Sequence, residues 1–360
     1  MQFDSRSTRR DFLKTACAGA AAASVLSTGA AADDEAPLPG TAVSKTYGET
    51  SAALQIADPS RFTILQVTDS HFFQVRKEIP NGNERTVGDW KKMVDLYKPD
   101  VVCMTGDLWH ENHDGTGAGY QQQAIAWLGE LGVPWTYSWG NHDQLDDQSK
   151  GHDALHDGKN SLYRGGPQSG NYTVSIQDKA GHPVWALLCM NTHRLGLVGT
   201  AYDWLTALVN ARKDNLNFQT RAFAFFHIPL QQYELLRTGG GMSGITMEGV
   251  CNETEKGDAL KQLAALGTVR ATFCGHDHVN DYSGVVDGIE LAYGRSSGWN
   301  AYGFDQVRKG GKLITANCET GSYAWESVFP DGLRWHPKPG DHIDKLIDEP
   351  WLNPKRIPAA

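Results

Sequence analysis

The chain lacks the features that mark several protein classes. Its mean hydropathy of −0.44 argues against a protein that crosses a membrane several times. None of its six cysteines forms a Cys-x-x-Cys pair, so the sequence indicates neither a zinc knuckle nor a disulfide framework, although it leaves a single disulfide open. Internal repeats are also absent, and the alanine-rich N-terminus is the only low-complexity tract.

Basic residues are also fewer than acidic ones. The chain holds 33 basic and 42 acidic residues, a formal net charge of −9. Residues 1–32 contain four of the basic and two of the acidic side chains, so without them 29 basic and 40 acidic residues remain, a net charge of −11. Nonspecific affinity for nucleic acid rests largely on Lys and Arg that neutralise phosphates. We therefore expect nucleic acid not to be a partner.

The first 32 residues have the features of an export signal. Arg9 and Arg10 form the twin arginine of a Tat signal, and a mildly apolar stretch ends in three small residues at 30–32, which are typical of a cleavage site. We interpret residues 1–32 as a Tat signal peptide. The expected partner during export is the Tat translocase, and the expected location is periplasmic or extracellular, with no stable membrane span after the signal is removed. Retention of the segment as an anchor is the alternative.

Five short polar segments, each preceded by an apolar run, carry most of the information in the chain. They are Thr-Asp-Ser-His at 68–71, Thr-Gly-Asp at 105–107, Gly-Asn-His-Asp at 140–143, Phe-His-Ile-Pro at 226–229 and Gly-His-Asp-His at 275–278. The β-branched and aromatic runs before them predict buried strands. In open α/β sheets, ligands gather at the carboxyl ends of the strands. The five segments are therefore expected to meet in one site.

Predicted strands and helices alternate from residue 61 onwards. Apolar runs predict strands at 62–67, 101–105, 135–139, 172–176, 184–190, 222–226, 271–274, 289–293 and 312–317, and helical spacing predicts helices at 86–97, 120–131, 201–211 and 256–266. Such alternation favours parallel crossovers in a sheet. The polar segment 144–170 and the glycine-rich segment 237–252 are expected to be irregular. We predict one α/β domain over 58–330, with two packed mixed sheets flanked by helices, after a linker at 33–57 and before a surface extension at 331–360.

The side chains of the five segments suit two neighbouring metal ions. The candidate ligands are Asp69, His71, Asp107, Asn141, His227, His276 and His278. Asp69 and His71 are alternate residues and can point the same way, and the two oxygens of Asp107 can bridge two ions. Carboxylate and imidazole together suit Zn, Fe or Mn, so we expect two divalent ions of these elements. Two ions about 4 Å apart lower the pKa of a water held between them and clamp phosphoryl oxygens.

His142 is the candidate catalytic residue. It follows the candidate ligand Asn141 directly, so its imidazole lies near the ions and can protonate a leaving alkoxide or orient the phosphate. Asp143 either orients His142 or caps a helix, and the sequence leaves both roles open. None of the five segments supplies a positioned nucleophilic side chain, so we expect no phosphoenzyme.

The order of the five segments resembles that of the calcineurin-like metallophosphoesterase superfamily, from about Arg61 to Gly303. Within it, residues 140–144 and 274–282 are similar to the small, single-domain branch related to purple acid phosphatases. The resemblance implies a four-layer α/β/β/α sandwich. It also implies two ligand sets, Asp69, His71, Asp107 and His278 for one ion and Asp107, Asn141, His227 and His276 for the other, with His142 catalytic.

The chain departs from purple acid phosphatases at His110. Those enzymes carry Gly-Asp-x-x-Tyr, whose tyrosinate on ferric iron gives the colour, whereas this sequence has Gly-Asp-Leu-Trp-His at 106–110. The resemblance therefore implies a colourless protein without obligatory ferric iron. His110 is a candidate for contact with a ligand or the substrate, or a plain loop histidine. Asn280 and Asp281 are candidates for hydrogen bonds to ligand imidazoles, and Arg295 for closing over a phosphate.

Together these observations predict an exported phosphoesterase with two metal ions. We expect it to hydrolyse phosphate monoesters, on small molecules or phosphoproteins, by in-line attack of a hydroxide held between the ions, with His142 as general acid or phosphate-orienting residue. The same site could serve a phosphodiesterase that acts on a cyclic nucleotide, a small diester or a nucleic acid. A non-catalytic metal-binding scaffold is the alternative of another class.

Overall fold

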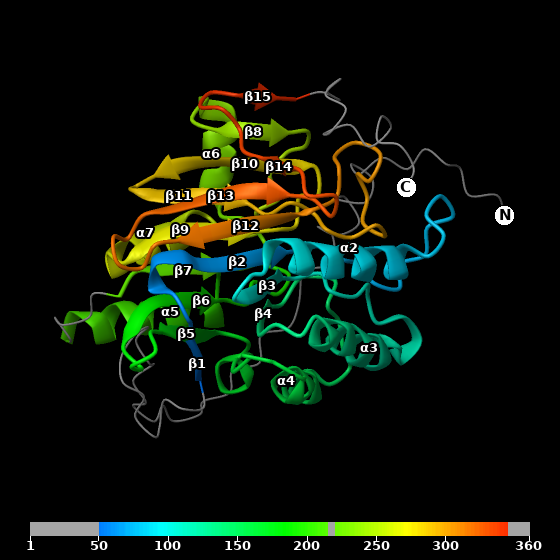
Figure 1. Cartoon of the computed structure of the whole chain (residues 1–360), viewed down its shortest axis with the longest axis horizontal. Coiled ribbons are helices and arrows are strands. Elements are labelled where there is room, and N and C mark those ends of the chain that lie inside the picture. Colours follow the sequence, from blue (N-terminus) through cyan, green and yellow to red (C-terminus); the bar gives the residue numbers. More distant parts are fainter. Residues whose placement is uncertain (1–49, 215–219, 345–360) are drawn as a thin grey trace. The chain divides into compact units, whose positions relative to one another are not determined.

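The computed structural model describes residues 50–214 and 220–344. The predicted Tat signal at 1–32, most of the predicted linker, and residues 345–360 lie outside this part of the chain. Within it, the backbone forms two β-sheets with helices on the outer face of each (Figure 1). This is the mixed α/β architecture that the sequence predicts. No helix in the two described ranges has both the length and the apolar character that a membrane crossing needs.

The first sheet has six strands and carries the first three polar segments. Its order is β14-β13-β12-β2-β3-β4, with β2 at Phe62–Val67, β3 at Val101–Thr105, β4 at Trp135–Ser138, β12 at Gly311–Ala316, β13 at Tyr323–Val328 and β14 at Arg334–Trp335. Strands β2, β3 and β4 are parallel, whereas β12 pairs antiparallel with both β2 and β13. The parallel half therefore ends at a single edge.

The second sheet has nine strands in the order β1-β5-β6-β7-β9-β11-β10-β8-β15. Their bounds are Ser51–Gln55 (β1), Tyr172–Gln177 (β5), Pro183–Cys189 (β6), Ala222–Phe225 (β7), Ser243–Thr246 (β8), Val269–Cys274 (β9), Asn280–Val286 (β10), Ile289–Tyr293 (β11) and His342–Ile343 (β15). Strands β6, β7, β9 and β11 are parallel neighbours. The carboxyl ends of β7 and β9, which carry the last two polar segments, therefore lie side by side.

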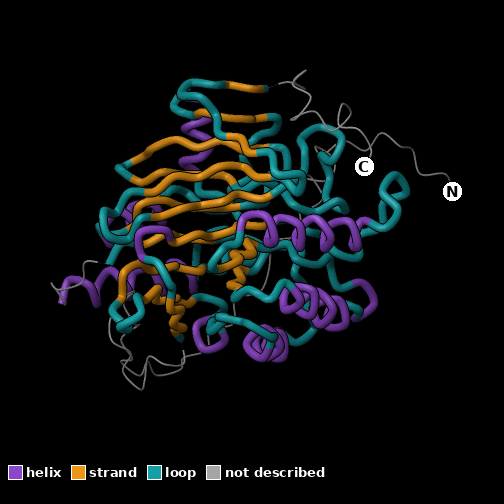
Figure 2. The backbone as a smooth tube through the Cα atoms, viewed as in Figure 1, coloured by secondary structure: helices purple, strands orange, loops and turns teal. Residues whose placement is uncertain are grey.

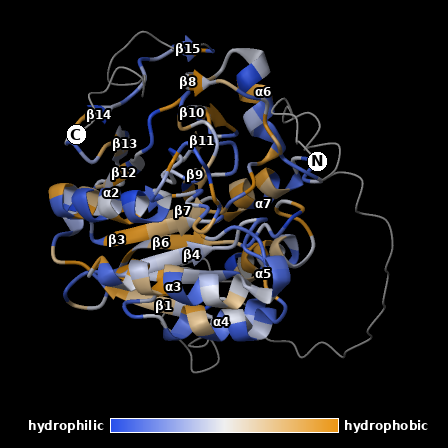
Figure 3. Ribbon diagram, turned by 90° about the vertical axis from the view of Figure 1, so that its right-hand side faces the viewer, coloured by the Kyte–Doolittle hydropathy of each residue, from blue (hydrophilic) through white to orange (hydrophobic). Residues whose placement is uncertain are grey.

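Six α-helices cover the outer faces of the two sheets. They are α2 (Gly82–Tyr97), α3 (Gly117–Glu130), α4 (Gln148–Asp157), α5 (Thr200–Asp214), α6 (Gln231–Gly239) and α7 (Asp258–Leu266) among the residues described. Helices α2 and α3 pack on the six-stranded sheet, and α5, α6 and α7 pack on the nine-stranded sheet. Strands run through the interior with helices outside them (Figure 2), and Figure 3 shows α2 on one side of the strands and α5, α6 and α7 on the other. The result is a four-layer α/β/β/α sandwich.

Strand β7 shows how the sequence builds these layers. Successive side chains of a strand point to opposite faces. Phe223 and Phe225 lie in the core between the two sheets, whereas Ala222 and Ala224 lie in the core under α5 and α7. Large residues thus fill the space between the sheets, and small residues let the helices approach. All four are fully buried, so the strand reads as a continuous apolar run.

The structure differs from the sequence prediction at several short elements. Residues 51–55, which we assigned to a linker, form β1 and pair with β5. Helix α4 lies inside the segment 144–170, which we expected to be irregular, and β8 lies inside 237–252. Strands β14 and β15 lie inside the predicted surface extension. Helix α4 buries only Gly151 and Leu155, so its sequence has almost no apolar periodicity, and its clearest signal is the N-cap Asp147.

Candidate metal centre

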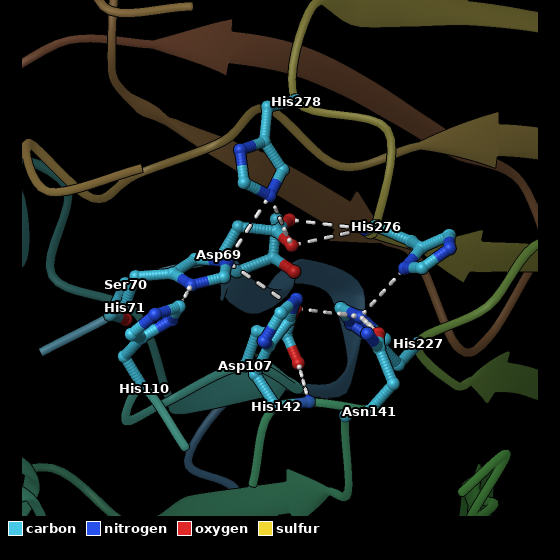
Figure 4. Close-up of polar contacts among 12 residues, drawn as sticks. Asp69, Ser70, His71, Asp107, His110, Asn141, His142, His227, His276 and His278 are labelled. Carbon is cyan, nitrogen blue, oxygen red and sulfur yellow. Dashed lines mark hydrogen bonds and ion pairs between the residues drawn. The ribbon is translucent and has the colours of Figure 1, made fainter. Parts of the chain in front are cut away.

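Five loops that follow five strands meet between the ends of the two sheets. Asp69 and His71 follow β2, Asp107 follows β3 and Asn141 follows β4, all in the six-stranded sheet. His227 follows β7, and His276 and His278 follow β9, in the nine-stranded sheet. Figure 4 shows the side chains of these seven residues turned toward one another. The structure therefore brings together all seven candidate ligands.

The first group of facing atoms contains Asp69, His71, Asp107 and His278. Their ligand atoms lie within 4.8 Å of one another, and all four residues are buried. His71 Nε2 is 3.2 Å from His278 Nε2 and 3.3 Å from Asp107 Oδ2. His278 Nε2 is 3.2 Å from Asp69 Oδ1. These are the four residues that the family resemblance assigns to one ion.

The second group contains Asp107, Asn141, His227 and His276. His227 Nε2 is 3.2 Å from Asp107 Oδ2, 3.0 Å from Asn141 Oδ1 and 3.2 Å from His276 Nδ1. The other nitrogen of His227 donates to the carbonyl of Thr105 at 2.8 Å, which leaves Nε2 as the nitrogen that faces the group. Asp107 Oδ2 thus stands between the two groups, as a bridging carboxylate oxygen would.

Four of these residues have a left-handed backbone. The φ angles are 56° at Asp69, 46° at His71, 53° at Asp107 and 79° at His276. Residues other than glycine rarely adopt such angles, and each instance costs on the order of 1–3 kcal/mol. The surrounding contacts fix them: the N–H of Asp69 donates to the carbonyl of Gly106, and that of His71 donates to the carbonyl of Asp107. The loops are therefore held in strained turns that aim the side chains inward.

Two glycines of the polar segments are required by close packing. A Cβ on Gly140 would lie 2.2 Å from both the backbone nitrogen and Oδ1 of Asp107. A Cβ on Gly275 would lie 2.1 Å from the hydroxyl of Thr68 and 2.8 Å from Asp69 Oδ2. The glycine of each segment thus allows a neighbouring segment to bring its carboxylate into the centre.

The facing nitrogen and oxygen atoms suit a metal ion placed between them better than they suit direct contact with one another. Imidazole nitrogens face each other at 3.2 Å in both groups, an arrangement in which lone pairs converge unless a cation or a proton lies between them. Burial alone would lower the pKa of His227, but the charges of Asp107 and Asp69 raise it to about 10. The buried carboxylates therefore attract positive charge. Two sets of four N and O ligands, with one oxygen shared, would meet this demand with two divalent ions.

His142 lies beside the two groups with its own carboxylate partner. Its Nδ1 donates to Glu111 Oε1 at 2.6 Å, and its backbone N–H donates to Asp107 Oδ1 at 2.9 Å. Burial alone would lower the pKa of His142, but Asp107 and Glu111 raise it above the ordinary value. Sequence reasoning missed Glu111. The available signal was an acidic residue four positions after Asp107, on the loop that also carries His110.

Asp143 holds the loops and does not orient His142. Its carboxylate accepts hydrogen bonds from the backbone N–H groups of Asp107, Leu108, Trp109 and Gly140, at 2.7–3.1 Å. Burial, followed by the charge of Asp107, raises the pKa of Asp143 to about 6 although these N–H groups lower it. Neither of the two roles we considered, orienting His142 or capping a helix, is what the contacts show. Asp143 fastens the second polar segment to the third.

His110 lies against a ligand and against His142. Its Nδ1 is 3.2 Å from Nδ1 of His71, the nitrogen of His71 that faces away from the first group. Its ring stacks on the ring of His142, with centroids 5.1 Å apart. Because burial, followed by the charges of His71 and His142, lowers its pKa to about 3, His110 is neutral and can accept the N–H of His71. It belongs to the centre and is not a plain loop histidine.

Asn280, Asp281 and Arg295 do not have the roles predicted for them. We expected Asn280 and Asp281 to bond ligand imidazoles and Arg295 to close over a phosphate. Asn280 Oδ1 accepts from the backbone of Met247 and Glu248. Asp281 accepts from Arg295, Lys312 and Ser327 in the interior. Arg295 is 1% exposed, so it cannot close over a phosphate. Asn280 and Asp281 are neighbours on β10 and point to opposite faces, and in the part of the chain described neither is hydrogen-bonded to a ligand imidazole.

Two further parts of the chain support His278 and His276. Tyr302 stacks on His278 with centroids 3.9 Å apart and donates to Glu248. On the other side, His276 Nε2 is buried without a hydrogen-bond partner and lies 3.8 Å from Glu253 Oε1. The usual arrangement for a metal-bound imidazole is a carboxylate on its other nitrogen, and Glu253 stands where such a carboxylate would be.

Comparison with known proteins places this centre in a family context. A sequence model of the family described as Calcineurin-like phosphoesterase matches residues 62–280, more than half of the chain. The chain is 25% identical over 341 residues to "Probable inactive purple acid phosphatase 14" of Arabidopsis thaliana, covering 82% of this chain and 84% of that protein. It is 28% identical over 284 residues to "Phosphatase DCR2" of Saccharomyces cerevisiae, covering 67% of this chain and 49% of that protein.

Solved structures show a similar but more distant likeness. A dimetal phosphatase from Danio rerio is 12% identical with a TM-score of 0.49, covering 71% of this chain and 93% of that one. GAP50, the anchor in the inner membrane complex of Plasmodium, is 9% identical with a TM-score of 0.47, covering 81% and 90%.

Proposed function

Because the chain belongs to the calcineurin-like phosphoesterase family, we propose that it is an exported hydrolase that uses two divalent metal ions to cleave phosphate monoesters. The ions are drawn from Fe, Mn and Zn, the elements that suit a mixed set of imidazole and carboxylate ligands. The observation that carries the proposal is the position of Asp107 Oδ2, 3.3 Å from His71 Nε2 in one group and 3.2 Å from His227 Nε2 in the other.

The residues divide the chemistry between them. Two bound divalent ions would supply an ionised water and would clamp the phosphoryl oxygens of an in-line displacement. His142 donates its Nδ1 proton to Glu111, so its Nε2 is the nitrogen free to give a proton to the leaving alkoxide. Asp107 accepts the backbone N–H of His142 through Oδ1 while Oδ2 faces the imidazoles, which fixes His142 relative to the ligands.

Metal analysis together with a hydrolysis assay tests this function. The purified protein should contain two metal ions per chain and release phosphate from p-nitrophenyl phosphate faster than it cleaves bis-p-nitrophenyl phosphate. Asp107→Asn should lose both metal and activity. His142→Asn should keep the metal and lose about 10²–10⁴-fold in kcat, the usual contribution of a general acid. His182→Asn is the control, because that side chain is 77% exposed.

Two results would change the assignment. Preference for the bis-ester would make the protein a phosphodiesterase. Full metal loading without hydrolysis of either ester would support a metal-binding scaffold, an alternative favoured by the word "inactive" in the names of three plant relatives. Against that alternative stand the two complete ligand groups and the pairing of His142 with Glu111.

Export rests on the N-terminal sequence alone. Arg9 and Arg10 support passage through the Tat translocase, a route for proteins that have already folded, and residues 1–32 support a cleaved signal. Phosphate esters outside the cytoplasm, on small molecules or proteins, are then the substrates within reach. Replacing both arginines by lysine should leave the protein in the cytoplasm at its full length, and unchanged secretion would contradict the proposal.

A further inference from the structure

A cavity of about 470 Å³ opens directly beside the second ligand group. Its wall includes Gly140, Asn141, Gln144, Gln148, His193 and Arg194. A second cavity, of about 560 Å³, continues from it and shares Gln148 and His193. Sites of a few hundred cubic ångströms hold whole small molecules, so the first cavity has room for a leaving group as well as a phosphoryl group.

Arg194 is the one permanent cation on the wall of the first cavity. The acidic residue there, Asp143, is buried, and its oxygens are occupied by backbone N–H groups. Arg194 is exposed. In the two described ranges its guanidinium has no ion-pair or hydrogen-bond partner. An unpaired guanidinium on a cavity wall is a ready partner for phosphate or carboxylate, which it can bind through two parallel N–H groups.

The loop that carries Arg194 is fixed at several points between β6 and α5. The backbone N–H of Asn191 donates to Asn171, and the hydroxyl of Thr192 accepts from the N–H of Ile228, the residue after ligand His227. The carbonyl of Leu195 accepts from both the N–H and the hydroxyl of Thr254. The backbone on either side of Arg194 is therefore anchored, and only the side chain remains to be ordered when an anion binds.

A charge interaction links Arg194 to Glu111, the partner of His142. Burial raises the pKa of Glu111 and the hydrogen bond from His142 lowers it, and the charge of Arg194 is near enough to lower it further. Glu111 in turn holds His142, the proposed donor to the leaving oxygen. Arg194 is thus close to the His142–Glu111 pair, and the cavity between Asn141 and Arg194 is where the body of the leaving group would lie.

We propose that Arg194 binds a second anionic group, a carboxylate or a phosphate, on the leaving group of the substrate. The inference rests on the proposed hydrolysis of phosphate monoesters and narrows it to esters that carry a further negative charge near the phosphoryl group. The second cavity contributes the exposed carboxylate of Asp153, which repels anions farther from the centre. Compact substrates with two anionic groups therefore fit better than long polyanions such as nucleic acid.

A matched pair of substrates tests the proposal. Glycerol 3-phosphate and 3-phosphoglycerate differ by one carboxylate on the leaving group. The unmodified protein should have a higher kcat/KM for 3-phosphoglycerate. Arg194→Gln should lower that value about tenfold, mostly through KM, and leave glycerol 3-phosphate almost unchanged. Arg194→Lys should keep part of the preference. Arg270→Gln is the control, because Arg270 is exposed at the far end of β9.

The outcomes distinguish a failure of this inference from a failure of the proposed phosphatase function. If neither ester nor p-nitrophenyl phosphate is hydrolysed, the proposed function is wrong, and the inference, which rests on it, is wrong as well. If all are hydrolysed but Arg194→Gln affects them equally, Arg194 serves the phosphoryl group itself and the inference is wrong while the function stands. A wild-type preference for glycerol 3-phosphate would overturn the inference as well.

Discussion

Asp107 joins three parts of the candidate centre through one carboxylate. One oxygen faces His71 and His227, and the other accepts the backbone N–H of His142. The Asp107 carboxyl is buried, yet the charges of His227 and His142 hold its pKa well below the ordinary value. Asp107 is therefore ionised at neutral pH. Its negative charge is the fixed point around which cations and imidazoles are arranged.

Glu111 offers a residue-scale test of how His142 is controlled. Glu111→Gln removes the charge that faces His142 Nδ1 and keeps nearly the same shape. Because the carboxylate favours the protonated imidazole, we expect kcat to fall about 10–100-fold. Because His142 must be protonated to act as the general acid, the alkaline limb of the kcat profile should move to lower pH, with metal content unchanged.

The control for this change is Glu130→Gln, which breaks the exposed pair with Lys91 and should change nothing. Loss of metal in Glu111→Gln, with kcat per bound metal preserved, would mean that Glu111 shapes the ligand groups instead. An unchanged pH profile would show that Glu111 has no influence on the proton of His142.

Among the secondary-structure elements, those that carry the site were predictable from sequence. The strands that precede the polar segments are mostly apolar and almost entirely buried, as in β3 at Val101–Thr105, where all five residues are buried. The parallel arrangement of β2, β3 and β4 follows from the helices between them. Composition and alternation were thus enough to place the ligands at one edge.

Elements without such a signal could not be predicted. Strand β1 is an edge strand of five residues with only Ala52 buried, so tertiary pairing with β5 decides its structure. Glu111 reaches His142 through a turn in which it has a φ of 65°, and no local pattern predicts that direction. Arg295 was a candidate for closing over a phosphate, but it is buried because Asp281 neutralises it within the fold.

Strand β10, the loop after β11 and strand β12 share a buried ion cluster that can be tested directly. Asp281 lies 2.6 Å from Arg295 Nη2 and 2.8 Å from Lys312 Nζ, and all three side chains are at most 1% exposed. Asp281→Asn would leave two buried cations without their anion. Such a loss costs about 3–5 kcal/mol, which denaturant unfolding would measure. Asp258→Asn, which breaks an exposed pair with Lys261 on α7, is the control and should cost less than about 1 kcal/mol.

The same cluster predicts how stability depends on pH. Burial alone would raise the pKa of Asp281, but Arg295 and Lys312 bring it below the ordinary 3.8. A carboxyl with a lowered pKa in the folded state stabilises fully above 3.8, and this contribution is lost as the pH falls through the lowered value. The unmodified protein should therefore lose stability below about pH 4 more steeply than Asp281→Asn. Parallel profiles would argue against the ion cluster.

At the scale of the whole molecule, the two sheets meet at the ligand groups. Asp69, Asp107 and Asn141 come from one sheet, and His227, His276 and His278 come from the other. Ions bound between them favour the folded chain, and at 100 times the dissociation constant one ion adds about 2.7 kcal/mol. For a domain of this size, that corresponds to roughly 4–5 °C in Tm.

Removal of the metal should therefore lower Tm by about this amount in a thermal scan after chelation. Adding back Mn²⁺ or Zn²⁺ should restore it. Asp107→Asn should unfold at the same temperature with or without chelator, since it has little to lose. An identical Tm for metal-free and metal-loaded wild-type protein would mean that the cations do not bridge the sheets.

The division of ligands between the sheets is also a division along the chain. The stretch before β5 brings Asp69, His71, Asp107 and Asn141, and the stretch that begins with β5 brings His227, His276 and His278. Neither stretch alone can complete a coordination sphere. If the gene is cut between them, cation uptake would report when the two fragments recognise each other and reassemble.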